Sequence, residues 1–597
     1  MPHATLAARR QQLLQMQEKL HAELKLLTEQ AHKLSWSRLL TFSLFILAAL
    51  YGVFEQQYWA LIPALLLIAG FMLLVRRHAL AEESLARQND ILAHLGRQLE
   101  RMSAEKPAAA PHGGGTEHPY AADLALDSSG RLFKQIDECA TARGSSRLAA
   151  WLQTSDGVDA ARLRQEAVRE LSGRHGELVL LQAQRQAAEH RGELQLLQWL
   201  ETGKAPTLPP ALLGLTLSLF ALVGAFSLVF NKFPWWLAII FVAPAIIYHS
   251  LQSLACKELE ESLGEASPGC LRRHAAFFRF ARSEFQAPLL RRLAADLPAG
   301  LADELTGLEE ELEAFAETRR NAALALAEPL LLRRPQIAAR ISRRHQRIGA
   351  SLGPALAASA DMDALAALAV FAWENPDFCW PEFVAEDRLA AEDLAHPLLH
   401  RDSRVANDLV LDDSCRLILI SGSNMAGKST FLRSVGVNAA LALAGAPVCA
   451  RSFALPDLQL SCCFSSGDSL DQGLSRFAAE VRRLAQVRDQ AKTGSRCHLV
   501  LLDEILSGTN SRDRVDGAGA YLADLFDGRC LGLVTTHDLA LCPVTEQIRG
   551  GARNCHFADT LLEGKMSFDY RMRPGVAGAG NALAVMRSFG LDVPARA

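Results

Sequence analysis

The residues with the clearest chemical potential are those of the segment Leu417–Thr430, LILISGSNMAGKST. Its first four residues, Leu417–Ile420, form an apolar run that predicts a buried strand, and a helical pattern begins at Lys428. Between them, Gly422 and Gly427 enclose four residues and precede a Lys and a Ser, which is the G-x-x-x-x-G-K-[ST] pattern. The backbone N–H groups of such a loop and the positive end of the following helix favour phosphate oxygens. We therefore expect a phosphate site here; a glycine-containing turn with an incidental lysine is the alternative.

The side chains of this loop have the chemistry that a nucleotide requires. Lys428 supplies a positive charge for the terminal phosphates, and the hydroxyl of Ser429 can ligate Mg²⁺. We therefore predict ATP with Mg²⁺ as the bound group. The residues predicted to hold the nucleotide are Gly422, Ser423, Asn424, Met425, Ala426, Gly427, Lys428, Ser429 and Thr430.

A second apolar strand, predicted at Leu499–Leu502, ends in Asp503-Glu504. Downstream of a phosphate loop, this pair is typical of a P-loop ATPase, in which the first carboxylate holds the Mg²⁺ shell and the second polarises the attacking water. A third strand, predicted at Leu531–Val534, leads to His537, which can sense or bond the γ-phosphate but on its own would more often be an ordinary loop histidine. We predict Lys428, Glu504 and His537 as catalytic residues, and Ser429 and Asp503 as metal ligands.

The composition indicates that apolar residues are concentrated in part of the chain. Of the 597 residues, 50% are hydrophobic and 21% are charged, with a formal net charge of −4. No global basic field therefore points to nucleic acid. Twelve cysteines are scattered between Cys139 and Cys555 without a C-x-x-C pair, which predicts reduced thiols in a cytosolic compartment. The first apolar run begins only at Leu39, so a cleavable signal is not expected.

Two pairs of apolar segments predict transmembrane helical hairpins. In the first pair, Leu39–Phe54 and Tyr58–Val75 are each close to the roughly 20 residues that cross a bilayer. In the second pair, Ala211–Phe230 and Trp235–Tyr248 are joined by a short turn. Arginines flank the outer ends of the first pair and none lies in its connection, which places both ends in the cytoplasm. Buried hairpins in a large soluble core are the alternative, although core helices normally keep a polar stripe.

These segments predict a multi-pass protein of the cytoplasmic (inner) membrane, with four spans and the ATPase domain facing the cytoplasm. The predicted domains are an amphipathic helix at 1–35, a first hairpin at 36–78, a helix and Pro/Gly linker at 79–118, the first part of a helical core at 119–205, a second hairpin at 206–252, the rest of the helical core at 253–375 and an α/β domain at 376–597.

The second part of the helical core carries a run of arginines. They are Arg333, Arg334, Arg340, Arg343, Arg344 and Arg347. Such a stripe can contact DNA phosphates without reading sequence. A solvated helix face, or attraction to an anionic membrane leaflet, explains the same pattern at least as well.

Four motifs together resemble those of the MutS family. GSNMAGKST, at 422–430, is similar to the family's G-P-N-M-G-G-K-S-T loop, in which the Asn-Met pair is the discriminating part. LLDEILSGTNSRD, at 501–513, is similar to its second motif, and TTHDLAL, at 535–541, to its histidine loop. GDSLDQGLSRFAAE, at Gly467–Glu480, is similar to its D-x-L-x-x-G-x-S-T-F-x-x-E signature. The resemblance covers about 125–205 and 375–595, most specifically in the ATPase part.

The resemblance implies roles for residues that spacing alone does not assign. Ser475 would open a helix that caps ATP bound to a partner subunit, so a homodimer is expected. Asn407 would belong to the entry strand beside the adenine. Ser423 and Ala426 replace a Pro and a Gly of the family's loop, and Arg476 replaces a Thr of its signature. The family's mismatch-reading domain with its Phe-x-Glu wedge finds no counterpart, and a membrane hairpin stands in that place.

The combined prediction is an α/β P-loop ATPase domain, ABC-like and of the MutS type, joined to an all-α core that carries two transmembrane hairpins. Such a protein would hydrolyse ATP at a dimer interface, coupled through its helical core to DNA binding in a mismatch-repair-like manner. The DNA contacts themselves are expected to be independent of sequence and of mismatches. An ABC-type ATPase with a membrane or protein client and no DNA role is the alternative. A scaffold that only binds nucleotide is a third reading, against which Lys428, Asp503 and Glu504 argue.

Overall fold

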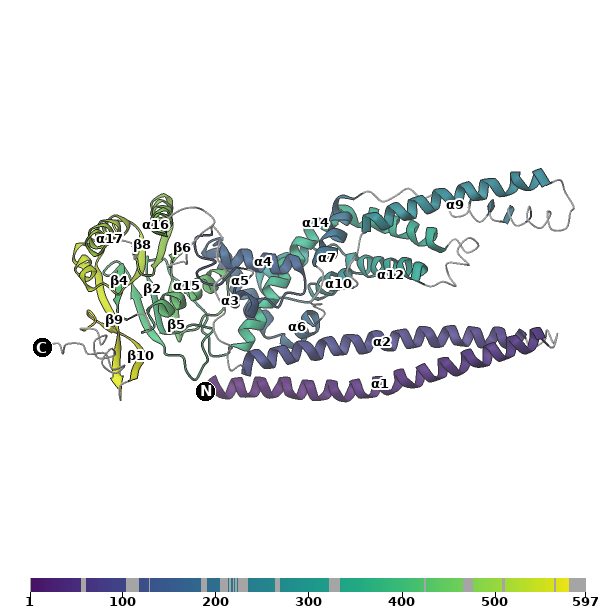
Figure 1. Cartoon of the computed structure of the whole chain (residues 1–597), viewed down its shortest axis with the longest axis horizontal. Coiled ribbons are helices and arrows are strands. Elements are labelled where there is room, and N and C mark those ends of the chain that lie inside the picture. The colour runs from purple at the N-terminus through teal and green to yellow at the C-terminus, as the bar shows by residue number, and fades with distance from the viewer. Residues whose placement is uncertain are drawn as a thin grey trace. The chain divides into compact units, whose positions relative to one another are not determined.

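The computed structural model describes residues 2–54, 61–103, 118–127, 129–183, 190–203, 235–263, 269–320, 333–423, 426–464, 476–506, 510–562 and 565–578, with isolated positions between 213 and 223. The chain divides into two compact units. The first contains Met1–Asp137, Ala149–Gln184 and Leu368–Ala597, and the second contains Glu138–Leu148 and Arg185–Ala367. Figure 1 labels most of the helices and strands of both.

A six-stranded sheet organises the C-terminal part of the first unit. Its order is β10-β9-β4-β8-β7-β6, and all neighbours pair in parallel except β10, which is antiparallel to β9. The strands are β4 (Leu417–Ser421), β6 (Leu458–Cys463), β7 (Cys497–Leu502), β8 (Cys530–Thr536), β9 (Ala552–Leu562) and β10 (Lys565–Pro574). The three strands predicted from apolar runs are confirmed as β4, β7 and β8, which are buried at every position as parallel strands covered on both faces must be.

Helices cover both faces of this sheet. They are α15 (Lys428–Ala444), α16 (Arg476–Thr493), α17 (Ser511–Leu525) and the 3₁₀ helix η3 (Leu539–Gln547). Leu502 packs in one core with Leu484 of α16 and Leu522 of α17. Leu501 points to the opposite face, where a methyl group at Gly436 of α15 would lie 2.8 Å from it, so α15 packs very closely there. A smaller sheet, β1-β5-β2-β3, consists of β1 (Glu382–Phe383), β2 (Leu389–Leu394), β3 (Asn407–Leu411) and β5 (Ser452–Leu455).

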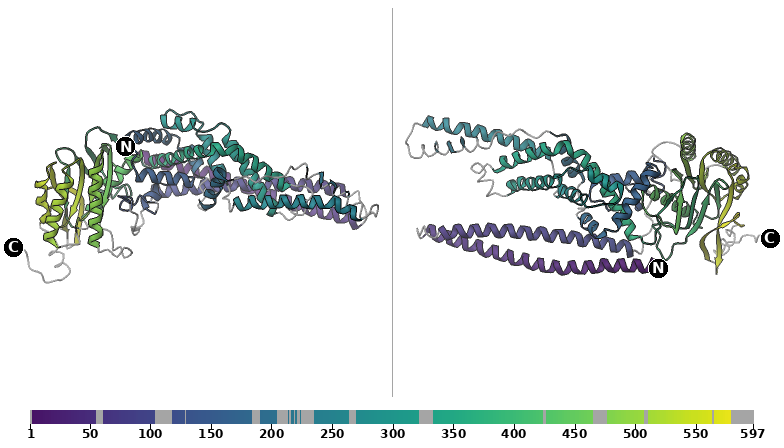
Figure 2. Two further views of the ribbon diagram at one scale, coloured as in Figure 1. Left: turned by 90° about the horizontal axis from the view of Figure 1, so that it is seen from above. Right: turned by 180° about the vertical axis from the view of Figure 1, so that it is seen from behind.

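Two long helices, α1 (Pro2–Phe54) and α2 (Leu61–Ser103), lie side by side in the first unit (Figures 1 and 2). The rings of Phe42 and Phe71 are 5.1 Å apart, and Gln88 bonds Glu23 at 3.1 Å, which makes the pair antiparallel. The predicted amphipathic helix and first apolar segment are thus one helix, because no glycine or proline interrupts residues 3–51.

The second unit is helical in its described residues. Its helices are the first part of α4 (Ala142–Gln153), α7 (His190–Thr202), α9 (Trp235–Leu263), α10 (Cys270–Phe280), α11 (Pro288–Ala295), α12 (Leu301–Arg320) and most of α14 (Arg333–Glu374). The first unit adds α3 (Arg131–Ile136), α5 (Val158–Ser172) and α6 (His175–Gln182). The prediction that residues 253–375 are helical is therefore confirmed where the chain is described, apart from short connections between the helices.

The sequence pattern of Leu132–Leu152 by itself predicts one continuous helix. This prediction is wrong, because the chain breaks between α3 and α4. The carboxylate of Asp363 accepts hydrogen bonds from Ala140 N at 2.9 Å and Thr141 N at 2.8 Å, and also from Thr141 Oγ1 at 2.7 Å. This carboxylate starts α4 as a cap supplied from far along the chain. The local sequence carries no signal of it.

Two described helices are long and apolar enough to cross a membrane by length and composition alone. In Thr5–Tyr51 none of the most apolar window is buried, whereas in Ser351–Glu374 89% of that window is buried, as in the core helix of a soluble protein. In the second predicted hairpin, the segment Trp235–Tyr248 lies in α9, and most of the segment Ala211–Phe230 lies outside the described residues.

Candidate active site

The phosphate loop joins β4 to α15 through two glycines in the left-handed region. Gly422 has φ +144° and Gly427 has φ +103°. A β-carbon at Gly422 would lie 2.8 Å from the carbonyl oxygen of Phe557, and one at Gly427 would lie 3.0 Å from the ring of Tyr570. Only glycine meets both the backbone and the steric requirement at these positions.

Lys428, the first residue of α15, is nearly fully buried. Its Nζ donates to the carbonyl oxygens of Gly422 at 2.7 Å and Ser423 at 2.9 Å, which holds the ammonium group against the loop. Burial lowers the pKa of Lys428, while the nearby charges of Glu504 and Asp503 act in the opposite direction. The lysine therefore lies within electrostatic reach of the loop and of both carboxylates.

The other loop residues are arranged around this lysine. Ala426 is buried and its N–H donates to Ser423 O at 3.2 Å. The buried Ser423 hydroxyl has no hydrogen-bond partner within the part of the chain that the structure describes. Ser429 is half-buried and Thr430 is exposed on the first turn of α15. Asn424 and Met425, the discriminating pair of the loop, lie outside the described residues.

Asp503 and Glu504 leave the sheet beside the loop because β8 lies between β4 and β7. Ser421 is in register with Thr536, and Leu502 with Val534, so the three carboxyl ends are neighbours. Thr535 bridges Asp503 and Glu504. Its Oγ1 donates to Asp503 Oδ1 at 2.5 Å and accepts from Glu504 N at 3.0 Å. The sequence places Thr535 ahead of His537 without assigning it this role.

Glu504 lies in a strained turn. It has φ +54°, as does Leu506, a conformation uncommon for residues other than glycine and costly to hold. Two side chains secure the turn at Leu506: Glu480 Oε1 accepts from its N–H at 2.5 Å, and Arg514 Nε donates to its carbonyl at 3.2 Å. Glu480 is the last residue of the predicted signature, so α16 is tied directly to the carboxylate turn.

His537 follows β8 and faces Glu504. Its Nδ1 lies 3.6 Å from Glu504 Oε1, and its side chain is about half exposed. The structure thus brings together Lys428, Asp503, Glu504 and His537 in one site at the carboxyl edge of the sheet. Ser475 lies outside the described residues, and α16 begins at the next residue, Arg476.

Tyr570 lies next to the loop at Gly427, and Asn407 bonds its backbone. The side chain of Asn407 donates to Tyr570 O at 3.0 Å and accepts from Met572 N at 2.7 Å, so its amide holds the irregular part of β10. Tyr570 has φ +53° and is 44% exposed, with its ring against Gly427. An exposed aromatic ring beside a phosphate loop is a candidate platform for a base. Sequence reasoning missed it, since Tyr570 follows Gly427 by more than 140 positions.

Residues 418–596 match the family model for MutS domain V. This part of the chain is therefore similar to MutS domain V. That domain is an ATPase with an ABC-like P-loop, so the prediction of an ATPase is confirmed for it.

Curated relatives agree with this assignment. The DNA mismatch repair proteins MutS of two strains of Lactobacillus delbrueckii subsp. bulgaricus are each 33% identical over 238 residues. The alignment covers 38% of this chain and 27% of each relative, so the chain spans about a quarter of the length of the curated relatives it matches.

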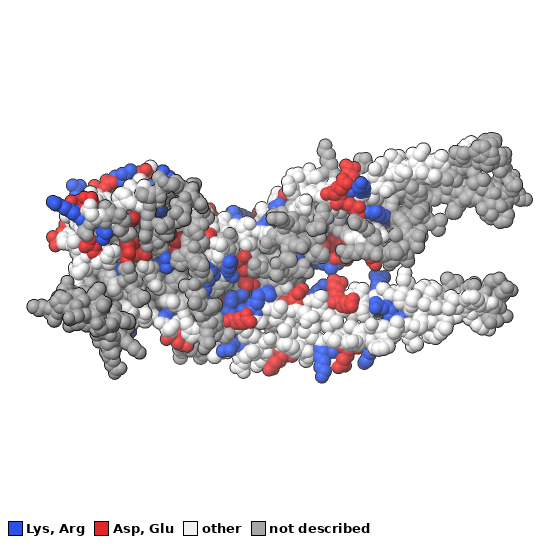
Figure 3. Space-filling view, viewed as in Figure 1, with Lys and Arg blue, Asp and Glu red and all other residues white. Residues whose placement is uncertain are grey.

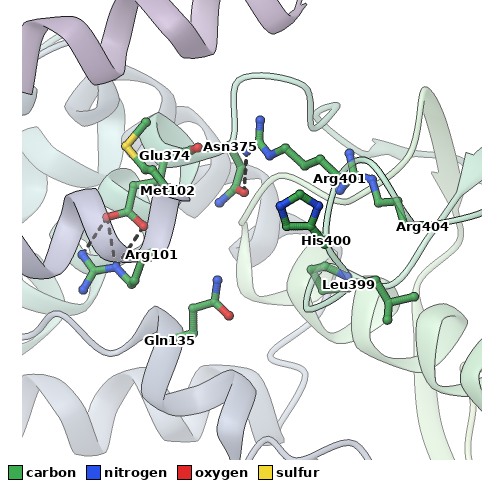
Figure 4. Close-up of a pocket in the computed structure, with 10 residues that line it drawn as sticks. Arg101, Met102, Gln135, Glu374, Asn375, Leu399, His400, Arg401 and Arg404 are labelled. Atoms are coloured by element: carbon green, nitrogen blue, oxygen red, sulfur yellow. Dashed lines mark hydrogen bonds and ion pairs between the residues drawn. The ribbon is translucent and has the colours of Figure 1, made fainter. Parts of the chain in front are cut away.

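A second, cationic pocket lies in the same unit, upstream of β3 (Figure 4). It is lined by Arg101, Met102, Gln135, Glu374, Asn375, Pro397, Leu399, His400, Arg401 and Arg404. Arg401 donates to Glu374 O and to Asn375 Oδ1, both at 3.1 Å. The loop that leads to Asn407 is therefore fastened to the end of α14.

Proposed function

We propose that this protein is a membrane-anchored MutS-type ATPase that binds ATP with Mg²⁺ at the loop 422–430 and hydrolyses it where two copies meet. The observation that carries the proposal is the convergence of Lys428, Asp503 and Glu504 at one edge of the sheet. Two further observations support a phosphate chain in the loop. Gly422 and Gly427 leave no room for a β-carbon, and the Ser423 hydroxyl has no hydrogen-bond partner among the described residues.

Each residue has a definite task in this proposal. Lys428 Nζ turns from the loop carbonyls to terminal phosphate oxygens, and loop N–H groups bind the others. Ser429 and Asp503 would hold Mg²⁺, which when bound neutralises phosphate charge. Glu504 orients the attacking water and accepts its proton, and His537 steadies the Glu504 carboxylate. The base would stack on Tyr570, with the strand that begins at Asn407 beside it.

The proposed dimer rests on the α16 helix. Phe477 and Val481 lie one turn apart on it and are 38% and 40% exposed. Apolar side chains at the start of the helix that follows Ser475 suit a contact with a second copy. In that contact Ser475 would reach ATP bound by the partner.

The proposed membrane anchor rests on the apolar surface of α1 and α2. Leu40, Leu47 and Phe54 on α1, and Leu66 on α2, are between 63% and 79% exposed. Ile240 and Ile247 of α9 are similarly exposed, at 60% and 61%. Side chains of this kind are stable in contact with lipid rather than water. We propose a cytoplasmic-membrane location with the ATPase domain on the cytoplasmic side.

DNA is the second candidate client, because the curated relatives are DNA mismatch repair proteins. Three of the six arginines predicted to contact phosphates are, however, paired with acids of α12. Arg344 lies 2.6 Å from Glu304 and 3.1 Å from Glu311, Arg347 lies 2.9 Å from Glu304, and Arg340 lies 3.4 Å from Glu311. These ion pairs reduce the field available to a phosphate backbone. They favour the alternative of a membrane or protein client.

ATP binding and hydrolysis by the detergent-solubilised full chain test the proposal. Lys428→Ala is expected to abolish ATP binding, because the phosphates lose their cation. Glu504→Gln is expected to bind ATP but to hydrolyse it about 10²- to 10⁴-fold more slowly, as for a lost general base. The matched control is Glu546→Gln, an exposed glutamate of η3, which should hydrolyse at the wild-type rate. Wild-type turnover by Glu504→Gln would remove Glu504 from the role.

A further inference from the structure

A groove lies on the α1–α2 pair where its apolar part begins. It has a volume of about 440 Å³ and is lined by Ser35, Trp36, Arg38, Leu39, Phe42 and Phe71. Polar and cationic groups lie toward one end of this set, and the apolar side chains Leu39, Phe42 and Phe71 lie toward the other. The Phe42 and Phe71 rings, 5.1 Å apart, fix the register of the two helices at this point.

Cations collect at the same level of the pair. Arg38 is four residues from Phe42, and Arg76 is five residues from Phe71 in the same direction along the pair, so both lie within about 8 Å of the ring pair along the axis. Arg77 and Lys33 extend the cationic band. No Asp or Glu occurs in residues 30–54 or 61–81, so no acid of these stretches neutralises it. Figure 3 shows uncharged surface beyond Lys and Arg side chains on this face of the pair.

The aromatic side chain at this level is placed for a membrane boundary. Trp36 is 71% exposed, and beyond it Leu39 and Leu40 are 56% and 63% exposed. An indole ring between charged and apolar zones is the arrangement that lipid headgroups favour. Arginine can extend its guanidinium to phosphate while its stem stays against apolar surface.

We propose that this groove binds an anionic glycerophospholipid of the cytoplasmic leaflet, and this inference rests on the proposed membrane anchoring. The phosphate would lie against Arg38, with Arg76 and Arg77 supplying further positive charge. One acyl chain would follow Leu39, Phe42 and Phe71 into the bilayer. A zwitterionic lipid carries a cation that this band repels, so the charge pattern selects the anionic class.

Native mass spectrometry of the full-length protein, released from mild detergent, tests the lipid class. Dioleoyl-phosphatidylglycerol and dioleoyl-phosphatidylcholine are added at equal concentrations. We expect the anionic lipid to be retained at least about threefold more, in line with the attraction of a few cations near a charged surface. Arg38→Gln should remove most of that preference, and Arg38→Lys should keep it.

The matched control is Arg10→Gln, which removes the same charge from an exposed position on α1, about 42 Å along the helix from Arg38. It should leave the preference unchanged. Flotation with phosphatidylcholine vesicles distinguishes failure of the proposed lipid site from failure of the proposed membrane anchor. Protein that floats with these vesicles but retains both lipids equally overturns the lipid site and leaves the anchor standing. Protein that fails to float overturns the proposed anchor, and the lipid site with it. Retention of a copurified protein in the groove, in place of lipid, would also overturn the proposal.

Discussion

Arg101 and Glu374 form a bidentate ion pair, with Arg101 Nη2 2.6 Å from Glu374 Oε1 and Arg101 Nε 3.1 Å from Oε2 (Figure 4). The two side chains are only 15% and 5% exposed. Arg101 lies in the last turn of α2, and Glu374 ends α14 immediately before the ATPase domain. The C-terminal end of α2 is thus joined to the C-terminal end of α14. The residue after α14, Asn375, accepts a hydrogen bond from Arg401.

Breaking this pair should destabilise the first unit strongly. Glu374→Ala leaves the Arg101 charge buried without its carboxylate, which typically costs about 3–5 kcal/mol. We expect a clearly lower thermal unfolding midpoint of the detergent-solubilised protein. Glu83→Ala is the control, since the Glu83–Arg87 pair is exposed at 3.7 Å and such a pair contributes about 0–1 kcal/mol. Equal midpoints for the two variants would show that the buried pair is not a structural junction.

Thr535 should be needed to position both carboxylates. Thr535→Val removes the hydroxyl that donates to Asp503 and accepts from Glu504 N. We expect kcat to fall about tenfold or more, because a lost hydrogen bond to a charged group costs about 1.5–3 kcal/mol. The Mg²⁺ concentration for half-maximal activity should rise as well. The measurement is steady-state ATPase activity across a Mg²⁺ titration.

Two variants make the Thr535 experiment specific. Thr535→Ser keeps the hydroxyl and should restore most of the activity. Thr493→Val, on the exposed end of α16, removes a hydroxyl that bonds only its own helix and should be silent. A Thr535→Val protein with normal kcat and normal Mg²⁺ dependence would exclude the bridging role.

The site divides into parts that the sequence could and could not predict. Leu417–Ile420 and the start of α15 at Lys428 were predictable because strand burial, glycine spacing and helix start are local signals. Thr535 and Tyr570 were not, since their roles depend on strands that meet only in the folded sheet. The break before α4 depends on Asp363, more than 200 residues away. The run of arginines after Arg333 is visible in the sequence. The ion pairs of three of them with α12 depend on tertiary packing and could not be predicted.

Ser475 should act in trans, on ATP bound by a second copy. Lys428→Ala and Ser475→Arg proteins should each be inactive alone. When they are mixed, one site of each hybrid dimer combines an intact loop with an intact Ser475. Random pairing at equal amounts should then restore about a quarter of wild-type activity. Ser495→Arg, an exposed position elsewhere in the domain, serves as the control substitution and should be active by itself. No recovery at any mixing ratio would show that Ser475 acts within its own subunit.

The two predicted hairpins should place residues 1–35, 79–205 and 255–597 on the cytoplasmic side. Gln56→Cys and Asn231→Cys, both outside the described residues, should react with an impermeant maleimide from outside. The native cysteines give a low background, because they are buried or half-buried and predicted to lie inside. Ser495→Cys should react only after permeabilisation. Labelling of Ser495→Cys, but not of Gln56→Cys, in sealed right-side-out vesicles would reverse the arrangement.

DNA binding, if it occurs, should be weak, steeply salt-dependent and nearly indifferent to mismatches. Contacts from arginines to phosphates carry no base information, and each one weakens as salt rises. Phe54-Glu55, the nearest approach to a Phe-x-Glu wedge, lacks the spacer residue. We expect less than about a threefold preference for mismatched duplex in fluorescence anisotropy titrations, against the roughly 1–3 kcal/mol of direct base recognition.

Substitution of Arg343 gives the sharpest test of whether the arginines of α14 contact DNA phosphates. It is exposed, and its guanidinium donates to Ala339 O of its own helix at 3.3 Å, so its removal breaks none of the ion pairs with α12. Arg343→Gln should weaken binding equally for matched and mismatched duplexes and lower the salt slope by about one. Arg292→Gln, an exposed arginine of α11, is the charge-matched control. A preference for mismatched duplex well above about threefold that persists at about 200 mM salt would require a base-reading element in this chain, because phosphate contacts carry no base information.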